Sequence, residues 1–250
     1  METYNLTLNS NADADLVWEQ LAAAGLQPLY AIEEGNSTII AANADFSPES
    51  LPNISHIEKI TLPEINWVEQ WELHGANFHD GLVHIEYPPL KLKPGPGFGD
   101  LSHPTTSLIL NLLPQYVKDQ HVVDVGSGSG ILTLAADALG ATSSTGIDIE
   151  PQAVTHAQEN AILNNSNAVF FLPDDLPALP SPTITLMNMV QNEQESAWPH
   201  YLSIWQNSSL LITSGILNKK KYLKFMLQNG WTPIHSTTLN KWHAFVFKRK

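Results

Sequence analysis

The strongest indication of the fold lies in residues 122–132, Val122-Val-Asp124-Val-Gly126-Ser-Gly128-Ser-Gly130-Ile-Leu132. An apolar run suited to a buried strand leads into three glycines at alternate positions, and a helical pattern follows. Because glycine has no Cβ, the backbone of such a loop can approach a ligand closely, and the first turn of a helix offers N–H groups without partners in the helix. We therefore expect a strand, a tight loop and a helix that together bind a small molecule.

A second carboxylate ends the next predicted strand. Asp148 lies 24 residues after Asp124, in Gly146-Ile-Asp148-Ile-Glu-Pro151. A carboxylate there can accept hydrogen bonds from both hydroxyls of a ribose. The loop spacing is G-x-G-x-G, and Ile131 stands where the G-x-G-x-x-G of a dinucleotide site has its last glycine. The pattern disfavours a nicotinamide enzyme; the alternative is an ordinary strand–turn–helix with a coincidental acid.

From residue 120 onward the chain alternates between strand and helix patterns, which predicts an α/β fold with a parallel, doubly wound sheet. The predicted strands are 121–125, 144–148, 168–172, 183–188 and 210–214, the helices are 130–139, 151–164 and 222–228, and residues 232–239 and 242–248 form a closing antiparallel pair.

The first 60 residues predict a small α+β module. Its pattern is a strand at 3–8, a helix after Asp13, and strands at 27–32 and 37–42 around a turn at 33–36. Residues 66–74 predict a helix on which Trp67 and Trp71 share one face and dock it on a neighbouring domain. The segment from Tyr87 to Pro104 is rich in proline and glycine and predicts a loop long enough to cover a ligand.

Composition favours a folded cytoplasmic enzyme. The 250 residues are 43% hydrophobic and 15% charged, so the chain can bury a substantial core. There is no cysteine, which excludes a disulfide scaffold, a thiolate zinc site and a catalytic cysteine. The opening METYNLTLNS lacks the pattern of a secretory signal, and no apolar run approaches the roughly 18 residues that span a bilayer.

The charge is divided unevenly along the chain. Residues 219–250 hold eight Lys/Arg and no acid, whereas residues 1–218 hold four Lys and 25 acids. An acidic field repels phosphate backbones and attracts cationic partners, so we expect no direct DNA binding and a basic protein as partner. The alternatives are that the acids only maintain solubility, and that Lys219–Lys221, expected to be a solvated face, contacts rRNA.

Several motifs resemble those of a known family. The glycine stretch is similar to motif I of the class I S-adenosylmethionine-dependent methyltransferases. Lys93–Thr106, ending in His-Pro-Thr-Thr, resembles the D-P-G-x-x-F-G-T-G-T-H-P-T-T loop of the ribosomal protein L11 methyltransferase family. Asp148–Val154 resembles that family's D-I-D-P-x-A-V, Ser214–Leu217 matches its S-G-I-L, and Asn188 falls in the place of its A-N-I.

The resemblance implies a fold and a domain division. A small ferredoxin-like domain for substrate recognition (residues 1–58) would precede a linker helix region (59–80) and a seven-stranded class I methyltransferase domain (81–250). The implied activity is methyl transfer from S-adenosylmethionine to lysine side chains or the terminal amine of ribosomal protein L11. We expect a monomer.

The resemblance also implies site residues. Gly126, Gly128 and Gly130 would cradle the amino-acid end of the donor, and Asp148 would hold its ribose. Three further residues would complete the donor pocket: Thr106, Asp124 and Asn188.

The reaction needs few catalytic groups. A sulfonium methyl group is already activated, so the enzyme must chiefly align an amine lone pair opposite the sulfur. With a free lysine pKa near 10.4, only about one amine in 2,500 is neutral at pH 7. A closed, dry site favours the neutral form, and we expect Asn188 or the carbonyls beside it to orient the amine. No strong general base is identified.

Three departures from the family pattern leave alternatives open. Gly99-Asp100-Leu101-Ser102 replaces G-T-G-T, Lys93 replaces the acid of D-P-G, and the segment from Trp67 to Gly81 lacks the family's basic residues. The alternatives are a donor-binding protein that has lost turnover and a methyltransferase for another basic protein.

The remaining polar residues do not indicate another chemistry. No two of the ten histidines have the spacing of a tight metal-ligand pair, and the nearest, His79 and His84, are five apart, so we expect no metal site. His103 is expected to brace the loop before it. The serines are not in a G-x-S-x-G setting, which disfavours a serine hydrolase.

Overall fold

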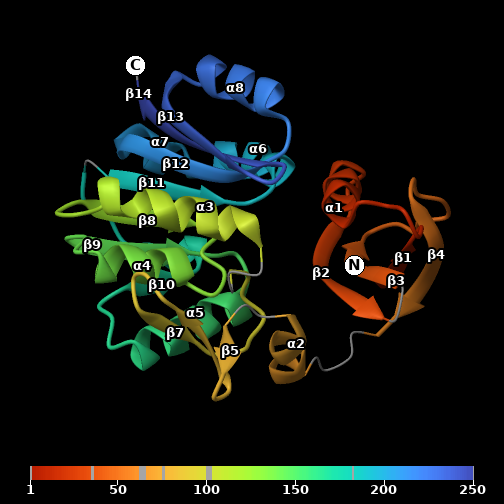
Figure 1. The fold of residues 1–250 in the computed structure, drawn as a ribbon. Helices are drawn as coiled ribbons and strands as arrows, with labels where there is room; N and C mark the ends of the chain where they lie inside the picture. Colours follow the sequence, from red (N-terminus) through yellow and green to blue (C-terminus); the bar gives the residue numbers. More distant parts are fainter. Residues whose placement is uncertain are drawn as a thin grey trace. The chain divides into compact units, whose positions relative to one another are not determined.

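The chain divides after residue 65 into two units, each with its own apolar core. The computed structural model describes residues 2–34, 37–61, 66–74, 77–99, 103–181 and 183–249. We call residues 1–65 the small unit and residues 66–250 the large unit, and Figure 1 traces both.

The small unit is an antiparallel sheet with one helix. Its elements are β1 (Glu2–Leu8), α1 (Ala14–Ala23), β2 (Gln27–Glu34), β3 (Ser37–Ala44) and β4 (Ile54–Ile60), and the strand order is β2-β3-β1-β4. α1 begins where the Asp13 carboxylate accepts hydrogen bonds from the first-turn amides, as the sequence predicted. Val17 and Leu21 of α1 are buried against Leu6 and Ile40 of the sheet.

Two features of the small unit differ from expectation. β4 was not predicted, and it continues past residue 58, since Lys59 and Ile60 pair with β1. Residues 45–53 form no helix between β3 and β4, so the βαββαβ order of a ferredoxin-like domain is incomplete in this unit. The turn predicted at 33–36 includes residues 35 and 36, which lie outside the described part of the chain.

The large unit is built on one mixed sheet of seven strands. In chain order they are β8 (His121–Val125), β9 (Ser143–Ile147), β10 (Val169–Phe171), β11 (Thr183–Asn188), β12 (Ser208–Ile216), β13 (Trp231–Leu239) and β14 (Trp242–Arg249). The order across the sheet is β10-β9-β8-β11-β12-β14-β13. The first five strands are parallel and β14 runs antiparallel between β12 and β13, so the predicted α/β fold is confirmed.

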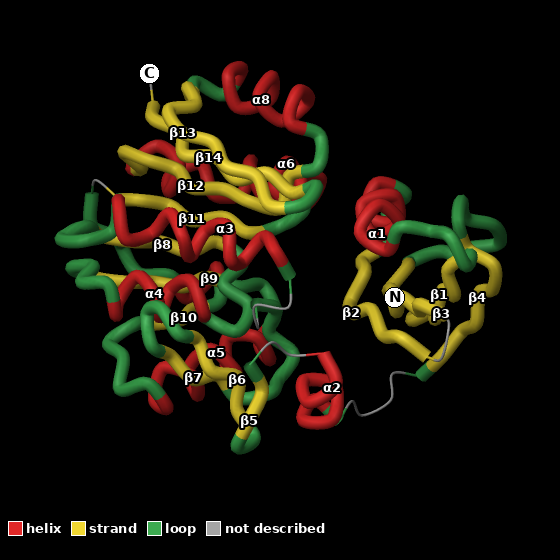
Figure 2. The backbone as a smooth tube through the Cα atoms, viewed as in Figure 1, coloured by secondary structure: helices red, strands yellow, loops and turns green. Residues whose placement is uncertain are grey.

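Helices cover both faces of this sheet. The helices are α3 (Pro104–Leu112), α4 (Ile131–Ala138), α5 (Pro151–Leu163), α6 (Gln191–Ala197), α7 (Leu202–Asn207) and α8 (Lys219–Gln228), with 3-10 turns η1 (Leu113–Gln115), η2 (Pro173–Asp175) and η3 (Trp198–Tyr201). Val122 belongs to the apolar cluster under α3, α4 and α5, whereas Val123 belongs to the cluster under α7 and α8. Neighbouring strand residues thus enter different cores, as in a sheet buried on both faces. Figure 2 shows the helices on both sides of the sheet.

A helix and a small sheet precede the main sheet. They are α2 (Trp67–His74), β5 (Phe78–His79), β6 (Leu82–Ile85) and β7 (Leu90–Leu92), with the strands in the order β5-β6-β7. Trp71 is buried in the core of the large unit and Trp67 packs against it, which confirms that the tryptophan pair docks α2. β7 lies inside the segment predicted to be a loop. Among the described residues no helix is long and apolar enough to cross a membrane.

The strand order of the main sheet reverses at β8, which is where open α/β sheets have a crevice beyond the carboxyl ends of their strands. The chain passes from β8 to β9 on one side of β8 and returns to β11 on the other side. In open α/β sheets ligands bind beyond the carboxyl ends of the strands at such a reversal of strand order. Asp124, Asp148 and Asn188 lie at or just after the carboxyl ends of β8, β9 and β11.

Candidate functional site

The loop of residues 126–130, here the glycine loop, joins β8 to α4 through three left-handed glycines. The φ angles are 75° at Gly126, 53° at Gly128 and 82° at Gly130, a region that other residues rarely adopt. A Cβ at Gly128 would lie 2.6 Å from the carbonyl oxygen of Phe98, and one at Gly130 would lie 2.8 Å from the ring of Phe170. The glycines therefore let other parts of this chain approach the loop closely.

The amides of the glycine loop do not point free into the site, which corrects the expectation from the sequence. The N–H groups of residues 126 and 127 bond the carbonyl of Ile147, and that of Gly130 bonds the carbonyl of Ser127. The Gly128 N–H donates to Asp148 Oδ2 at 2.9 Å, and that of Ser129 donates to the Phe98 carbonyl at 2.9 Å. The loop folds back on β9 and on residue 98, so four of these donors bond backbone carbonyls and the fifth, the Gly128 N–H, bonds the Asp148 carboxylate.

The glycine loop instead presents hydrogen-bond acceptors. Among the described residues no group donates to the carbonyl oxygens of Gly126 and Gly128. Three buried side-chain oxygens nearby also have no partner: Asp124 Oδ1, Ser127 Oγ and Asn188 Oδ1. A site rich in unpartnered acceptors suits a ligand that carries N–H or O–H groups and positive charge.

The two carboxylates are held differently. Asp148 accepts from Gly128 N–H at 2.9 Å and from Glu150 N–H at 3.0 Å, which fixes its side chain after β9 and leaves further lone pairs open. Asp124 is fully buried, and its Oδ2 accepts from Thr133 Oγ1 at 2.8 Å. Burial raises the pKa of Asp124 to about 7; the Thr133 hydrogen bond opposes this shift and the charge of Asp148 adds to it.

Thr106 and Asn188 are brought together from positions far apart in the sequence. Thr106 is buried in the first turn of α3, and Asn188 is the last residue of β11. Asn188 Nδ2 donates to Thr106 Oγ1 at 3.3 Å, which leaves the buried Asn188 Oδ1 unpartnered. The acceptor on which the predicted role of Asn188 depends is therefore available.

His103 links the preceding loop to the large unit. Its side chain caps α3, since Nδ1 accepts from Thr105 N–H and bonds Thr105 Oγ1 at 2.8 Å. Its ring meets Phe98 and Trp242 edge-on, at centroid distances of 5.7 and 5.0 Å. These contacts support a bracing role. Residues 100–102, on which the alternative of lost turnover rests, lie outside the described residues.

Sequence reasoning missed a buried amide that holds the Asn188 segment. Gln194 Nε2 donates to the carbonyls of Met189 at 2.6 Å and Ser214 at 2.7 Å, and Gln194 Oε1 accepts from Tyr222 Oη. Gln194 is fully buried, and its bonds to Met189 and Ser214 tie the residue after Asn188 to the neighbouring strand β12. No signal in the sequence indicated that Gln194 is buried, because a glutamine in a polar helical segment is ordinarily expected to be exposed.

The structure also brings His79 and His84 together, which the five-residue spacing concealed. They lie diagonally across the β5–β6 hairpin beside Asp80, and their rings stack at 3.6 Å with an angle of 13°. The lone pairs of an imidazole lie in the plane of its ring, and two nearly parallel planes do not converge on one ion. This arrangement does not support a metal site.

Comparison with known proteins identifies the family. A family model described as ribosomal protein L11 methyltransferase (PrmA) matches residues 12–250. The chain belongs to this family. A ribosomal protein L11 methyltransferase of Hydrogenovibrio crunogenus is 34% identical over 248 residues, which cover 94% of this chain and 82% of that protein. One from Laribacter hongkongensis is 32% identical over 227 residues, which cover 88% of this chain and 70% of that protein.

A solved L11 methyltransferase structure agrees with this membership. The ribosomal protein L11 methylase from Lactobacillus delbrueckii subsp. bulgaricus is 29% identical, with a TM-score of 0.55 over 64% of this chain and 84% of that chain. The motif resemblance found in the sequence is thereby confirmed as membership of the L11 methyltransferase family.

Proposed function

We propose that this chain methylates amines of ribosomal protein L11 with S-adenosylmethionine, and that the crevice beyond β8, β9 and β11 binds the donor. Membership of the L11 methyltransferase family makes the protein an S-adenosylmethionine-dependent enzyme. The location of the site is inferred from the buried oxygens of Asp124, Ser127 and Asn188 that have no hydrogen-bond partner.

The chemistry of these residues fits the donor. The carbonyl oxygens of Gly126 and Gly128 accept from its ammonium group, and Asp148 accepts from its ribose hydroxyls. Gly130 keeps the loop compact, while Asp124 and Thr106 complete the polar lining. S-adenosylmethionine supplies a methyl group on a positively charged sulfur, so no side chain has to activate it.

The amine is oriented by the segment after β11. Asn188 Oδ1 accepts one N–H of the neutral amine, which directs the nitrogen lone pair toward the methyl group. Thr106 fixes the orientation of the Asn188 amide through the 3.3 Å bond to Nδ2. Because burial disfavours the charged ammonium form, this chain needs a dry site more than a strong base.

The small unit serves substrate recognition in this proposal. Residues 1–65 contain ten Asp/Glu and one Lys, a charge that attracts a basic protein. The order β2-β3-β1-β4 with α1 supports a ferredoxin-like module that lacks the second helix. Because β4 ends at Ile60, the linker region proposed to follow this module begins after that residue and extends to residue 80, before the methyltransferase domain at 81–250. The protein then acts as a cytoplasmic monomer on L11, without direct DNA binding.

A mass measurement tests the proposal. The purified protein is incubated with S-adenosylmethionine and L11 from its own organism, and L11 is expected to gain mass in steps of one methyl group. Asn188→Ala is expected to bind S-adenosylhomocysteine but methylate slowly, because the donor keeps its other partners. Unchanged L11 mass, with an active family member alongside, would refute the proposal.

A further inference from the structure

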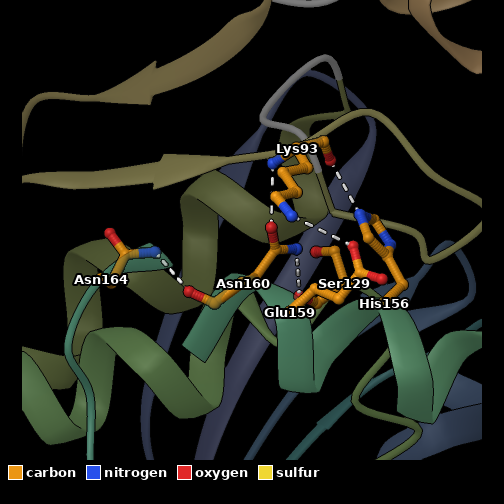
Figure 3. Close-up of polar contacts among 6 residues, drawn as sticks. All are labelled: Lys93, Ser129, His156, Glu159, Asn160 and Asn164. Carbon is orange, nitrogen blue, oxygen red and sulfur yellow. Dashed lines mark hydrogen bonds and ion pairs between the residues drawn. The ribbon is translucent and has the colours of Figure 1, made fainter. Parts of the chain in front are cut away.

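Helix α5 carries a row of polar side chains that bond the backbone of neighbouring segments. His156, Asn160 and Asn164 are spaced four residues apart and so share one face of the helix. His156 and Asn160 are buried. Figure 3 shows the row beside Lys93, with the glycine loop represented by Ser129.

The side chains of this row form hydrogen bonds with the backbone along the open edge of β7, where another strand would otherwise pair. Asn164 accepts from the Lys91 N–H at 2.8 Å and donates to the Lys91 carbonyl at 2.7 Å. Asn160 Oδ1 accepts from the Lys93 N–H at 2.8 Å, and His156 Nε2 bonds the Lys93 carbonyl at 2.7 Å. Both backbone groups of each lysine are thus satisfied by α5.

The same row ties residues 93–99, here the covering segment, to the glycine loop. Asn160 Nδ2 donates to the Ser129 carbonyl at 2.9 Å, while the Ser129 N–H donates to the Phe98 carbonyl. The Gly97 N–H donates to His156 Nδ1 at 3.1 Å. A Cβ at Gly97 would lie 2.4 Å from the Ser129 nitrogen, so the two segments are in backbone contact.

These contacts fix the protonation state of His156. Nδ1 accepts a hydrogen bond and therefore carries no proton, so the proton is on Nε2, which donates to the Lys93 carbonyl. An imidazolium has no acceptor and would place a second N–H against that of Gly97. Burial lowers the pKa of His156, and the Lys93 carbonyl and the carboxylate of Glu159 act in the opposite direction. Lys93 and Glu159 form a 3.3 Å ion pair nearby, and α2 contributes Trp71, which is uncharged.

We propose that His156 is a positioning residue that holds the covering segment on the glycine loop, and that a proton on Nδ1 releases the segment and weakens donor binding. This rests on the proposed donor site, since the covering segment bonds the Ser129 peptide of that loop. His156 does not touch the reacting atoms. It acts through Gly97 and Lys93.

Hydrogen exchange of the intact, ligand-free protein tests the positioning role. At pH 8 the Gly97 amide is expected to exchange at least tenfold faster in His156→Ala than in the wild type, because its acceptor is gone. In His156→Asn, whose Oδ1 can replace Nδ1 as acceptor, protection is expected to return. Unchanged protection in His156→Ala overturns the proposal. If that variant fails to fold, the wild type and His156→Asn are compared as the pH is lowered: earlier loss of Gly97 protection in the wild type supports the proposal, and equal protection at every pH overturns it.

Calorimetry with S-adenosylhomocysteine tests the consequence for the donor. Below the pKa of His156, the affinity of the wild type is expected to fall more steeply with decreasing pH than that of His156→Asn. The extra fall approaches tenfold per pH unit, because binding of one proton is linked to release of the covering segment. The exposed His235→Gln is the matched control and is expected to behave as the wild type. Equal pH slopes in the wild type and His156→Asn overturn the proposal. Failure of the wild type to bind at pH 8, with Gly97 still protected, counts against the proposed donor site instead.

Discussion

Asp148 fixes the conformation of the glycine loop and, in the proposed site, also binds the donor. One oxygen accepts the Gly128 N–H, so the side chain fixes the loop before any ligand arrives. Asp148→Ala should therefore weaken S-adenosylhomocysteine binding by about 1.5–3 kcal/mol, the range for hydrogen bonds to a charged group. Calorimetry measures the loss, and Glu150→Ala, a neighbour whose side chain does not cap the loop, should bind normally. Equal affinity of Asp148→Ala and the wild type would remove Asp148 from the site.

Asp124 makes folding stability depend on pH. Its pKa is about 7 in the folded protein and near 3.8 in the unfolded chain. Between about pH 4 and 7 the carboxyl group is therefore protonated in the folded protein and ionised in the unfolded chain. The free energy of unfolding should fall as pH rises from about 4 to 7, by up to about 1.4 kcal/mol per pH unit. Asp124→Asn should remove this part of the fall. Urea unfolding of both proteins across that range measures the difference, and parallel curves would contradict it.

At the residue level, the sequence predicted which residues lie together more accurately than it predicted their hydrogen bonds. Asp124, Asp148 and Asn188 lie at the strand endings that the sequence predicted. Thr106 contacts Asn188, and the family resemblance had implied that both residues belong to the donor pocket. The amides of the glycine loop were expected to be free. They are bonded because Asp148 and Phe98 reach the loop by tertiary contacts, which spacing along the chain does not encode.

The elements predicted best are those whose patterns come from burial. The strand at 183–188 coincides with β11, in which Thr183 to Met187 are all buried and the first three residues are β-branched, as strands favour. β4 was missed because Ile54-Ser-His-Ile-Glu-Lys-Ile60 has apolar residues three apart and no strand alternation. β5 and β7 are two and three residues long, too short for any period to show.

Helix α5 provides a test at the level of elements. Asn160 is fully buried and bridges Lys93 to Ser129, so Asn160→Ala leaves one N–H and one carbonyl without partners. We expect a loss of about 2–4 kcal/mol in the free energy of unfolding. Asn164→Ala, at the more exposed end of the same row, should lose about half as much. Urea denaturation compares the two, and equal losses would mean that the bridge to the glycine loop contributes nothing.

At the scale of the whole molecule, the two units differ in charge and in contents. The large unit contains the crevice and every residue assigned to the donor, whereas the small unit contains ten acids, one lysine and a separate core. A substrate-binding role for the small unit therefore predicts that electrostatics affects the protein substrate and leaves the donor largely unaffected. Salt separates the two, because it screens attraction between exposed charges.

Raising the ionic strength from about 0.05 to 0.3 M should raise the KM for L11 severalfold, since the Debye length falls below the range over which the acids attract a basic protein. S-adenosylhomocysteine affinity should change by less than about twofold, because the residues proposed to bind it are buried or half-buried and are screened poorly by salt. Charge reversal tests the location: Glu58→Lys, exposed on β4, should raise the KM for L11 and reduce its salt dependence. Glu86→Lys, equally exposed on the large unit, is the matched control and should change neither. If both reversals raise the KM alike, net charge attracts L11 and the small unit has no special part in recognising it.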